Sequence, residues 1–230
     1  MNDKSTPTET SGGVNKFLSK VAATPVMKPS VDRGKLIFAM DATASRESTW
    51  YRACRLQGEM FKATDSLGGL SIQLCYYRGF AEFKACKWCS SGDSLLQQMS
   101  DVRCRGGYTQ IHRALKHTLS QPNIQAVVFV GDAIEENPDA LCQLAGKLGL
   151  LNIPLFMFQE GAHPQVRSIF TQMAHLSGGA YAPFDLNSAN ELKQLLSAVA
   201  VFAAGGPQAL EDFSQDVGPL VKQITRQMKE

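Results

Sequence analysis

A short segment near the start of the chain restricts the fold more than any other. The apolar run from Leu36 to Met40 has the length of a β-strand that is covered on both faces, as in the middle of a parallel sheet. The run ends at Asp41, Thr43 and Ser45, whose oxygen-bearing side chains are spaced two residues apart. Open α/β sheets bind ligands at the carboxyl ends of their strands. The segment therefore predicts a central strand that presents polar side chains at a binding edge.

Strand and helix patterns alternate along the rest of the chain. Strands are expected at 35–40, 70–77, 80–88, 124–130, 153–158 and 180–184. Helices are expected at 46–67, 91–100, 109–120, 138–148, 164–176 and 188–203. Gly79 supplies the positive φ of a tight turn, which makes 80–88 an antiparallel edge strand. We therefore predict an α/β fold with a doubly wound, mostly parallel six-stranded sheet, one antiparallel edge strand and helices on both faces.

The chain divides into three parts by composition. At 230 residues it is long enough for one sizeable α/β domain. Residues 1–32 are rich in Ser, Thr, Pro, Asn and Lys and predict a flexible arm with at most one short helix. Residues 33–204 carry the alternating pattern and are expected to form the domain. Residues 205–230 begin with Gly-Gly-Pro and predict a helical tail that either docks as a last helix or reaches a partner.

The overall composition excludes several functional classes. The 23 basic and 21 acidic residues are dispersed, so no polybasic stripe favours nucleic acid as a partner. No apolar stretch approaches the roughly 20 residues that span a bilayer, and the N-terminus lacks the apolar core of a secretory signal. Six scattered cysteines are typical of free thiols in a reducing compartment. We expect a cytoplasmic protein with no membrane segment.

Two later segments bring further oxygen donors to the same edge of the predicted sheet. Thr109 lies at or near the N-cap of the helix at 109–120. Asp132 follows the apolar strand at 124–130. Two carboxylates and three hydroxyls are hard donors, which suit Mg²⁺ or Mn²⁺ better than Zn²⁺. The candidate metal ligands are Asp41, Thr43, Ser45, Thr109 and Asp132.

This set of residues resembles the metal-ion-dependent adhesion site (MIDAS) of von Willebrand factor type A (VWA) domains of the bacterial cytoplasmic type. That site has the pattern D-x-S-x-S, then a Thr, then an Asp, and the resemblance covers most of residues 34–204 by the order and spacing of elements. Thr43 replaces the first Ser and keeps a hydroxyl. Tyr108 is inserted in the G-G-T block, and Gly-Asp-Ala replaces the commoner Thr-Asp-Gly around Asp132.

The resemblance implies a role for each of the five residues. Thr43, Ser45 and Thr109 would be hydroxyl ligands, and Asp41 and Asp132 would bind the ion directly or through water. Two carboxylates roughly neutralise a divalent ion, so the metal stays electrophilic toward an outside oxygen, usually an Asp or Glu of a partner protein. The resemblance also implies an AAA-type ATPase as a partner. We therefore expect a non-catalytic, magnesium-dependent protein-interaction module.

Two rival functions remain open from the sequence. A magnesium-dependent phosphohydrolase or nucleotide-binding protein would use the same sheet edge. However, the D-x-D of an aspartyl-phosphate hydrolase is here Asp41-Ala42-Thr43, and no P-loop or G-x-G-x-x-G follows a strand. None of the four histidines falls beside a predicted strand end, which leaves no evident base. The second rival is a scaffold that binds no metal, in which Asp41 and Ser45 only cap a helix.

Other polar residues have a functional and a simpler interpretation. Arg46, Arg103 and Arg105 lie in or beside the predicted site loops and either grip an acidic or phosphorylated partner or are merely solvated. Glu135 and Glu136 either add a carboxylate to the ion or, as we expect, face solvent near the next helix start. Cys86, Cys89, His112 and His117 are expected to be ordinary thiols and packed or exposed imidazoles, because their spacing fits no metal or redox motif.

Overall fold

A six-stranded sheet forms the centre of the computed structural model, which describes residues 33–64, 67, 69–184 and 189–229. The strands lie in the order β3-β2-β1-β4-β5-β6, and β3 is antiparallel to β2 while the other neighbours are parallel. They are β1 (Gly34–Asp41), β2 (Leu70–Arg78), β3 (Glu82–Ala85), β4 (Ala126–Gly131), β5 (Leu155–Glu160) and β6 (Tyr181–Phe184). This confirms the predicted sheet. The expected arm at 1–32 lies outside the described residues.

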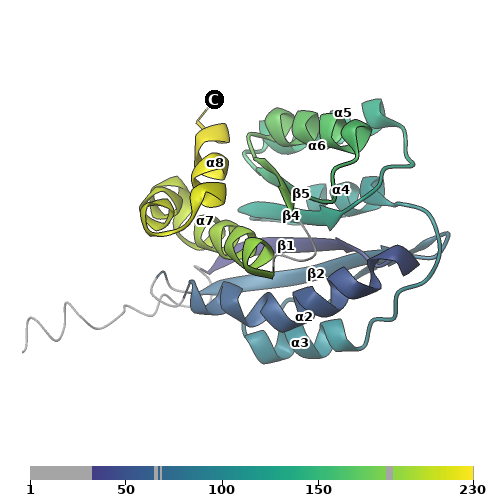
Figure 1. Ribbon diagram of the computed structural model, residues 1–230, viewed down its shortest axis with the longest axis horizontal. Coiled ribbons are helices and arrows are strands. Elements are labelled where there is room, and N and C mark those ends of the chain that lie inside the picture. The colour runs from purple at the N-terminus through teal and green to yellow at the C-terminus, as the bar shows by residue number, and fades with distance from the viewer. Residues whose placement is uncertain (1–32, 65–66, 68, 185–188, 230) are drawn as a thin grey trace, which may run out of the picture.

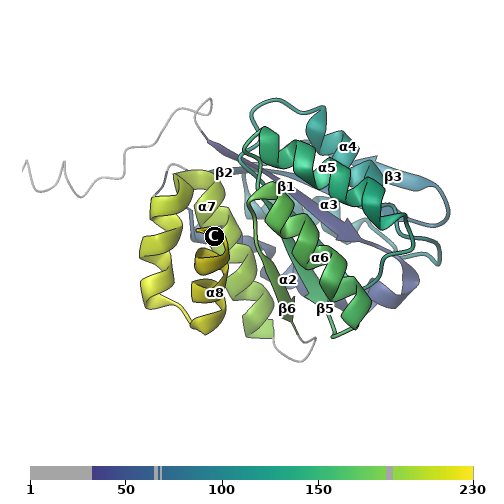
Figure 2. The same ribbon diagram turned by 90° about the horizontal axis from the view of Figure 1, so that it is seen from above.

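Helices cover both faces of the sheet, as Figures 1 and 2 show. One face carries α2 (Glu47–Lys62), α3 (Gly92–Ser100), α7 (Ala189–Asp216) and α8 (Pro219–Gln227), and the other carries α4 (Ile111–Leu119), α5 (Pro138–Leu150) and α6 (Pro164–Ser177). Strand β1 sends Phe38 to the first face and Ile37 to the second, and both side chains are fully buried. The apolar run is continuous because both faces of β1 are covered. None of the described helices is long and apolar enough to cross a membrane.

Two elements are clearly shorter than the sequence predicts. The helix expected to reach residue 67 ends at Lys62, where the Thr64 hydroxyl donates to the carbonyl oxygens of Met60 and Phe61 and competes with helix continuation. The strand expected at 80–88 is shorter, because the turn occupies residues up to 81 and regular pairing ends at Ala85. Beyond it the chain still follows β2, with an isolated bridge between Cys89 and Ile72.

The C-terminal part packs on the same core as the first part of α7. Gly206, with φ 76° and ψ −168°, makes a kink, and the helix resumes with Pro207 and continues to Asp216. Positive φ favours glycine, and proline suits a first helical turn, so Gly-Gly-Pro bends the helix where the sequence predicts its end. Leu210 on α7 and Ile224 on α8 are buried in the cluster that covers the first face.

The last helix also closes an open edge of the sheet. Strand β6 is an edge strand, so one side of its backbone has no neighbouring strand. The side-chain amide of Gln227 on α8 fills this place, because it accepts from Tyr181 N at 2.8 Å and donates to Tyr181 O at 3.0 Å. These bonds satisfy groups that would otherwise offer a template for strand addition.

Candidate metal centre

The two candidate carboxylates lie at the carboxyl ends of neighbouring strands. Met40 of β1 pairs with Val130 of β4, so Asp41 and Gly131 end their strands side by side. A Cβ atom built on Gly131 would lie 3.7 Å from the Cβ of Asp41, and Asp132 is the next residue. The negative charge of Asp132 acts on the carboxyl group of Asp41 and helps to raise its pKa. The two aspartates therefore lie at the same edge of the sheet, at the ends of neighbouring strands.

Asp41 is almost fully buried, at 1% exposure, and its carboxylate is held by two donors. Its Oδ1 accepts from Thr43 N at 2.7 Å, and its Oδ2 accepts from the Tyr77 hydroxyl at 3.1 Å. Burial raises the pKa of Asp41, and the charge of Asp132 adds to this, although the bonds from Thr43 oppose it. Burial and the charge of Asp41 also raise the pKa of Tyr77, which therefore stays a donor. A nearby cation would relieve the unfavourable burial of this charge.

Thr43 and Ser45 bring two hydroxyls together directly after β1. The chain turns there through a short 3₁₀ helix, η2 (Ala44–Arg46), which leads into α2. The Thr43 Oγ1 and Ser45 Oγ atoms lie 3.3 Å apart. Thr43 is buried and Ser45 is exposed, so this pair reaches from the interior to the surface beside Asp41.

Thr109 is fixed to the loop that carries Asp132. It lies two residues before the start of α4, and its hydroxyl accepts from Glu135 N at 2.9 Å. In return the Glu135 carboxylate accepts from Thr109 N at 2.7 Å. Among the described residues no hydrogen bond joins Thr109 to Asp41 or Asp132. The structure thus joins Thr109 to the loop that carries Asp132 through Glu135.

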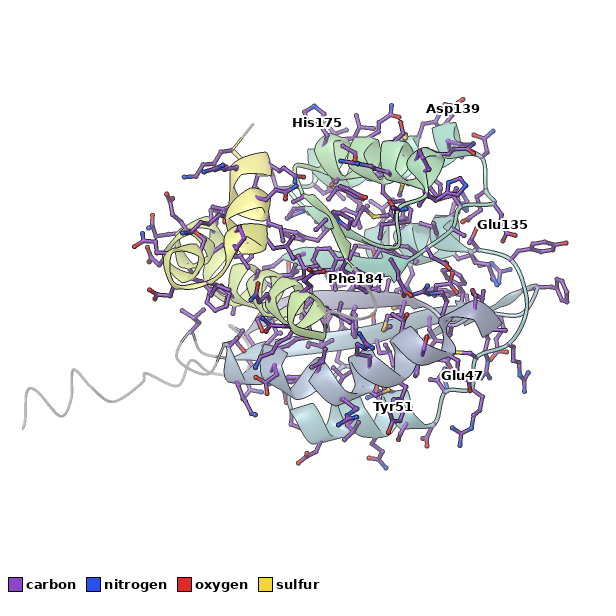
Figure 3. All side chains as sticks on the ribbon, viewed as in Figure 1. Glu47, Tyr51, Glu135, Asp139, His175 and Phe184 are labelled. Carbon is purple, nitrogen blue, oxygen red and sulfur yellow. The ribbon has the colours of Figure 1, made fainter. Side chains whose placement is uncertain are left out.

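The two glutamates after Asp132 have a role that sequence reasoning missed. Both were expected to face solvent near the start of the following helix. Glu135 is exposed, as expected, and its carboxylate also accepts from Thr109 N, whereas the partly buried Glu136 accepts from Ile111 N at 2.7 Å and from His112 N at 2.8 Å. Their carboxylates satisfy N–H groups at the start of α4, where negative charge is favourable. Figure 3 shows Glu135 at the same end of the molecule as Glu47, the first residue of α2.

Arg46 neither reaches outward to a partner nor is solvated, so both roles expected for it from the sequence are wrong. Its side chain is buried, and its Nη1 lies 3.1 Å from Asp132 Oδ2. Its Nη2 pairs with the Glu160 carboxylate and donates to the Thr49 hydroxyl at 2.6 Å. Sequence reasoning missed Glu160. The signal was present, because Glu160 follows an apolar strand in the same way as Asp132 does. The guanidinium therefore bridges the ends of β4 and β5 by contacting one carboxylate with each Nη atom.

Solved structures with the same arrangement of elements were found, although no protein-family model and no curated protein matches the sequence. A von Willebrand factor type A protein from Catenulispora acidiphila is 13% identical, with a TM-score of 0.59 over 74% of this chain and 43% of that chain. The SpRpn10 VWA domain is 10% identical, with a TM-score of 0.56 over 72% of this chain and 97% of that domain. The chain has the VWA fold.

A third VWA-type match is described with a metal in its site. Proximal thread matrix protein 1 from the mussel byssus, with a zinc-occupied MIDAS motif, is 13% identical, with a TM-score of 0.56 over 73% of this chain and 46% of that chain. This chain thus spans less than half the length of the Catenulispora and mussel proteins. At such identities the likeness shows the fold alone. The metal in the mussel protein is a property of that protein.

Among the described residues, the side chains that most often bind metals in proteins do not gather into a site. Within the described part of the chain, no group of three or more His, Cys, Asp or Glu could hold a metal ion. His117 bonds to Gln73 Oε1 at 2.8 Å, and burial lowers its pKa. Cys89 is buried, its thiol donates to Ile72 O at 3.3 Å, and burial raises its pKa to about 11. A metal at this edge would therefore depend on the hydroxyls and the two aspartates.

Gly107 allows the loop before Thr109 to pack closely on the β2–β3 turn. A Cβ atom at Gly107 would lie 1.9 Å from Gly79 O, whereas a Cβ at Gly106 meets nothing within 4 Å. We expect Gly107→Ala to lower the free energy of unfolding by about 1–3 kcal/mol. Gly106→Ala is the matched control and should change it by no more than about 0.5 kcal/mol. Urea denaturation of both variants checks this, and equal stabilities would contradict the close approach.

Proposed function

We propose that this chain is a protein-interaction module that binds a divalent ion, Mg²⁺ or Mn²⁺, and uses it to coordinate a carboxylate of a partner protein. The ion would be held by Asp41, Thr43, Ser45, Thr109 and Asp132. The observation that carries the proposal is the buried carboxylate of Asp41, whose pKa is raised by burial and by the neighbouring charge of Asp132. A buried carboxylate without a cation of its own, next to a second carboxylate, favours a bound cation.

The donor set fits such an ion. Carboxylate and hydroxyl oxygens are the ligands that Mg²⁺ and Mn²⁺ prefer, and two carboxylates balance the charge of one divalent ion. The Thr43 and Ser45 hydroxyls already lie 3.3 Å apart beside Asp41. When bound, the ion would supply an electrophilic position for an oxygen from outside the chain. The residues of this chain would orient the ion and leave that position accessible through the exposed side of Ser45.

An exposed aromatic pair next to the site supports a protein partner. Phe80 and Tyr108 are 75% and 57% exposed, and their rings contact edge to face with centroids 5.4 Å apart. Tyr108 precedes the proposed ligand Thr109, and the exposed side chains of Arg103 and Arg105 lie on the same loop. Aromatic residues and arginine are enriched at protein interfaces, and positive charge favours an acidic partner. A cytoplasmic complex with an AAA-type ATPase is the partner class that the VWA resemblance implies.

Affinity capture with and without metal tests this function. We expect the immobilised wild-type protein to capture its partner in the presence of Mn²⁺ and to release it in EDTA. The Asp41→Ala variant should capture no partner in either buffer. The partner should then be produced in pure form, and replacement of its essential Asp or Glu by the amide should lower affinity at least about tenfold. Equal capture in EDTA, or by a folded Asp41→Ala variant, would contradict metal-dependent docking.

The aromatic pair can be tested in the same assay. The double variant Phe80→Ala with Tyr108→Ala should weaken capture of the purified partner by about tenfold or more, as for an aromatic hot spot, while keeping the Mn²⁺-induced rise in melting temperature. Leu150→Ala is the matched control. Leu150 is 85% exposed, but it ends α5 at the far end of the helix from the site. If the double variant and the control bind the partner equally well, the pair is not part of the interface.

A further inference from the structure

A buried ionic cluster adjoins the proposed metal site and shares one proposed ligand, Asp132, with it. It consists of Arg46, Thr49, Glu160 and, at its edge, Asp132. The Arg46 guanidinium pairs with both carboxylates, and the Thr49 hydroxyl accepts from Arg46 and donates to Glu160. Arg46, Thr49 and Glu160 are each less than 9% exposed. A guanidinium withdrawn from water in this way must keep its acceptors, because an unpaired buried charge is strongly unfavourable.

The two carboxylate partners of Arg46 are not held equally. Glu160 is buried and receives hydrogen bonds from both Arg46 and Thr49. The Asp132 side chain is 29% exposed, and the described contacts join it to Arg46 alone. Asp132 is therefore the partner that can leave, while Glu160 and Thr49 are the partners that can retain the guanidinium.

We infer that Arg46 is an internal cation that competes with the divalent ion for Asp132. This inference rests on the proposed metal function and adds that Arg46 regulates the affinity of the site for the metal ion. Without metal, Arg46 neutralises Asp132. When an ion binds, Asp132 turns to the metal, and Glu160 and Thr49 hold the guanidinium. Arg46 has no acceptor atom and cannot be a ligand, so its effect on metal affinity is exerted through the position and availability of Asp132.

Two variants separate this competition from a simple change in net charge. Glu160→Gln removes the retaining carboxylate, so Arg46 has Asp132 as its remaining carboxylate partner and Mn²⁺ affinity should fall by about tenfold. The double variant Arg46→Gln with Glu160→Gln removes one positive and one negative charge and so keeps the formal charge of the wild type. It frees Asp132, and its Mn²⁺ affinity should rise by about tenfold above the wild type.

The measurement is a calorimetric titration with Mn²⁺ alone, together with melting in EDTA to verify folding. Arg105→Gln is the control, because its side chain is 65% exposed and its charge is screened by solvent, so Mn²⁺ affinity should change by less than about twofold. A double variant that binds Mn²⁺ no more tightly than the wild type, or a Glu160→Gln variant that is not weakened, overturns the inference. If the inference fails in this way but the wild type binds Mn²⁺ and the Asp41→Asn variant does not, the proposed metal site stands. If neither the wild type nor the double variant binds Mn²⁺, both proposals are wrong.

Discussion

Replacing Arg46 by alanine should lower the free energy of unfolding by about 3–5 kcal/mol, because it leaves the buried Glu160 carboxylate without its cation. Thr49 would remain as a single neutral donor to Glu160, which is insufficient for a desolvated charge. Urea denaturation followed by tryptophan fluorescence measures the loss, and Trp50 on α2 is buried close to Arg46 along the chain.

Two comparisons make this prediction specific to the buried pair. Arg103→Ala removes an exposed arginine of the neighbouring loop and should change stability by no more than about 0.5 kcal/mol. Arg46→Gln combined with Glu160→Gln should recover most of the lost stability, because no unpaired charge is left in the interior. A loss below about 1 kcal/mol for Arg46→Ala would show that solvent reaches the cluster.

Mn²⁺ should stabilise the protein by about 2.7 kcal/mol when the free ion is present at about 100 times its dissociation constant. Asp41→Asn should abolish this response, because an amide removes one of the two charges that hold the ion. In EDTA the same variant should be more stable than the wild type. The raised pKa of Asp41 means that its charged form is disfavoured in the folded state, and asparagine removes that charge.

Thermal melting in EDTA and in Mn²⁺ checks both halves of this prediction. Asp139→Asn is the matched control, because Asp139 is an exposed carboxylate near the start of α5 and not a proposed ligand. Its Mn²⁺ response should equal that of the wild type. If Asp41→Asn is destabilising in EDTA and still responds to Mn²⁺, Asp41 has a structural role only.

The layout of the fold follows from patterns that are local in the sequence. The run from Leu36 to Met40 indicates a central strand because burial on both faces leaves no polar position, and its two clusters of contacts bear this out. The end of α2 and the kink at Gly206 are less predictable. The first depends on the hydrogen bond from Thr64 back to the helix, and the second on how the second half of α7 packs. The spacing of apolar residues predicts neither.

The placement of four of the candidate residues at one edge of the sheet also follows from local patterns. Strand ends place Asp41 and Asp132 at one edge, and the spacing of Thr43 and Ser45 places their hydroxyls beside Asp41. Sequence spacing cannot give the direction of a long side chain. The burial of Arg46 could therefore not be predicted. Its partner Glu160 lies on another strand, far along the chain, and this contact forms only when the sheet assembles.

A calorimetric Mn²⁺ titration of the metal-free protein and of single-residue variants tests whether an ion is held at the end of β1. The wild type should bind one ion per chain. Ser45→Ala should bind it more weakly, since one hydroxyl ligand is lost, and Asp41→Asn should show no binding. If Asp41→Asn binds Mn²⁺ with the affinity and stoichiometry of the wild type, the ion is not held at the end of β1, and the metal-dependent account is wrong.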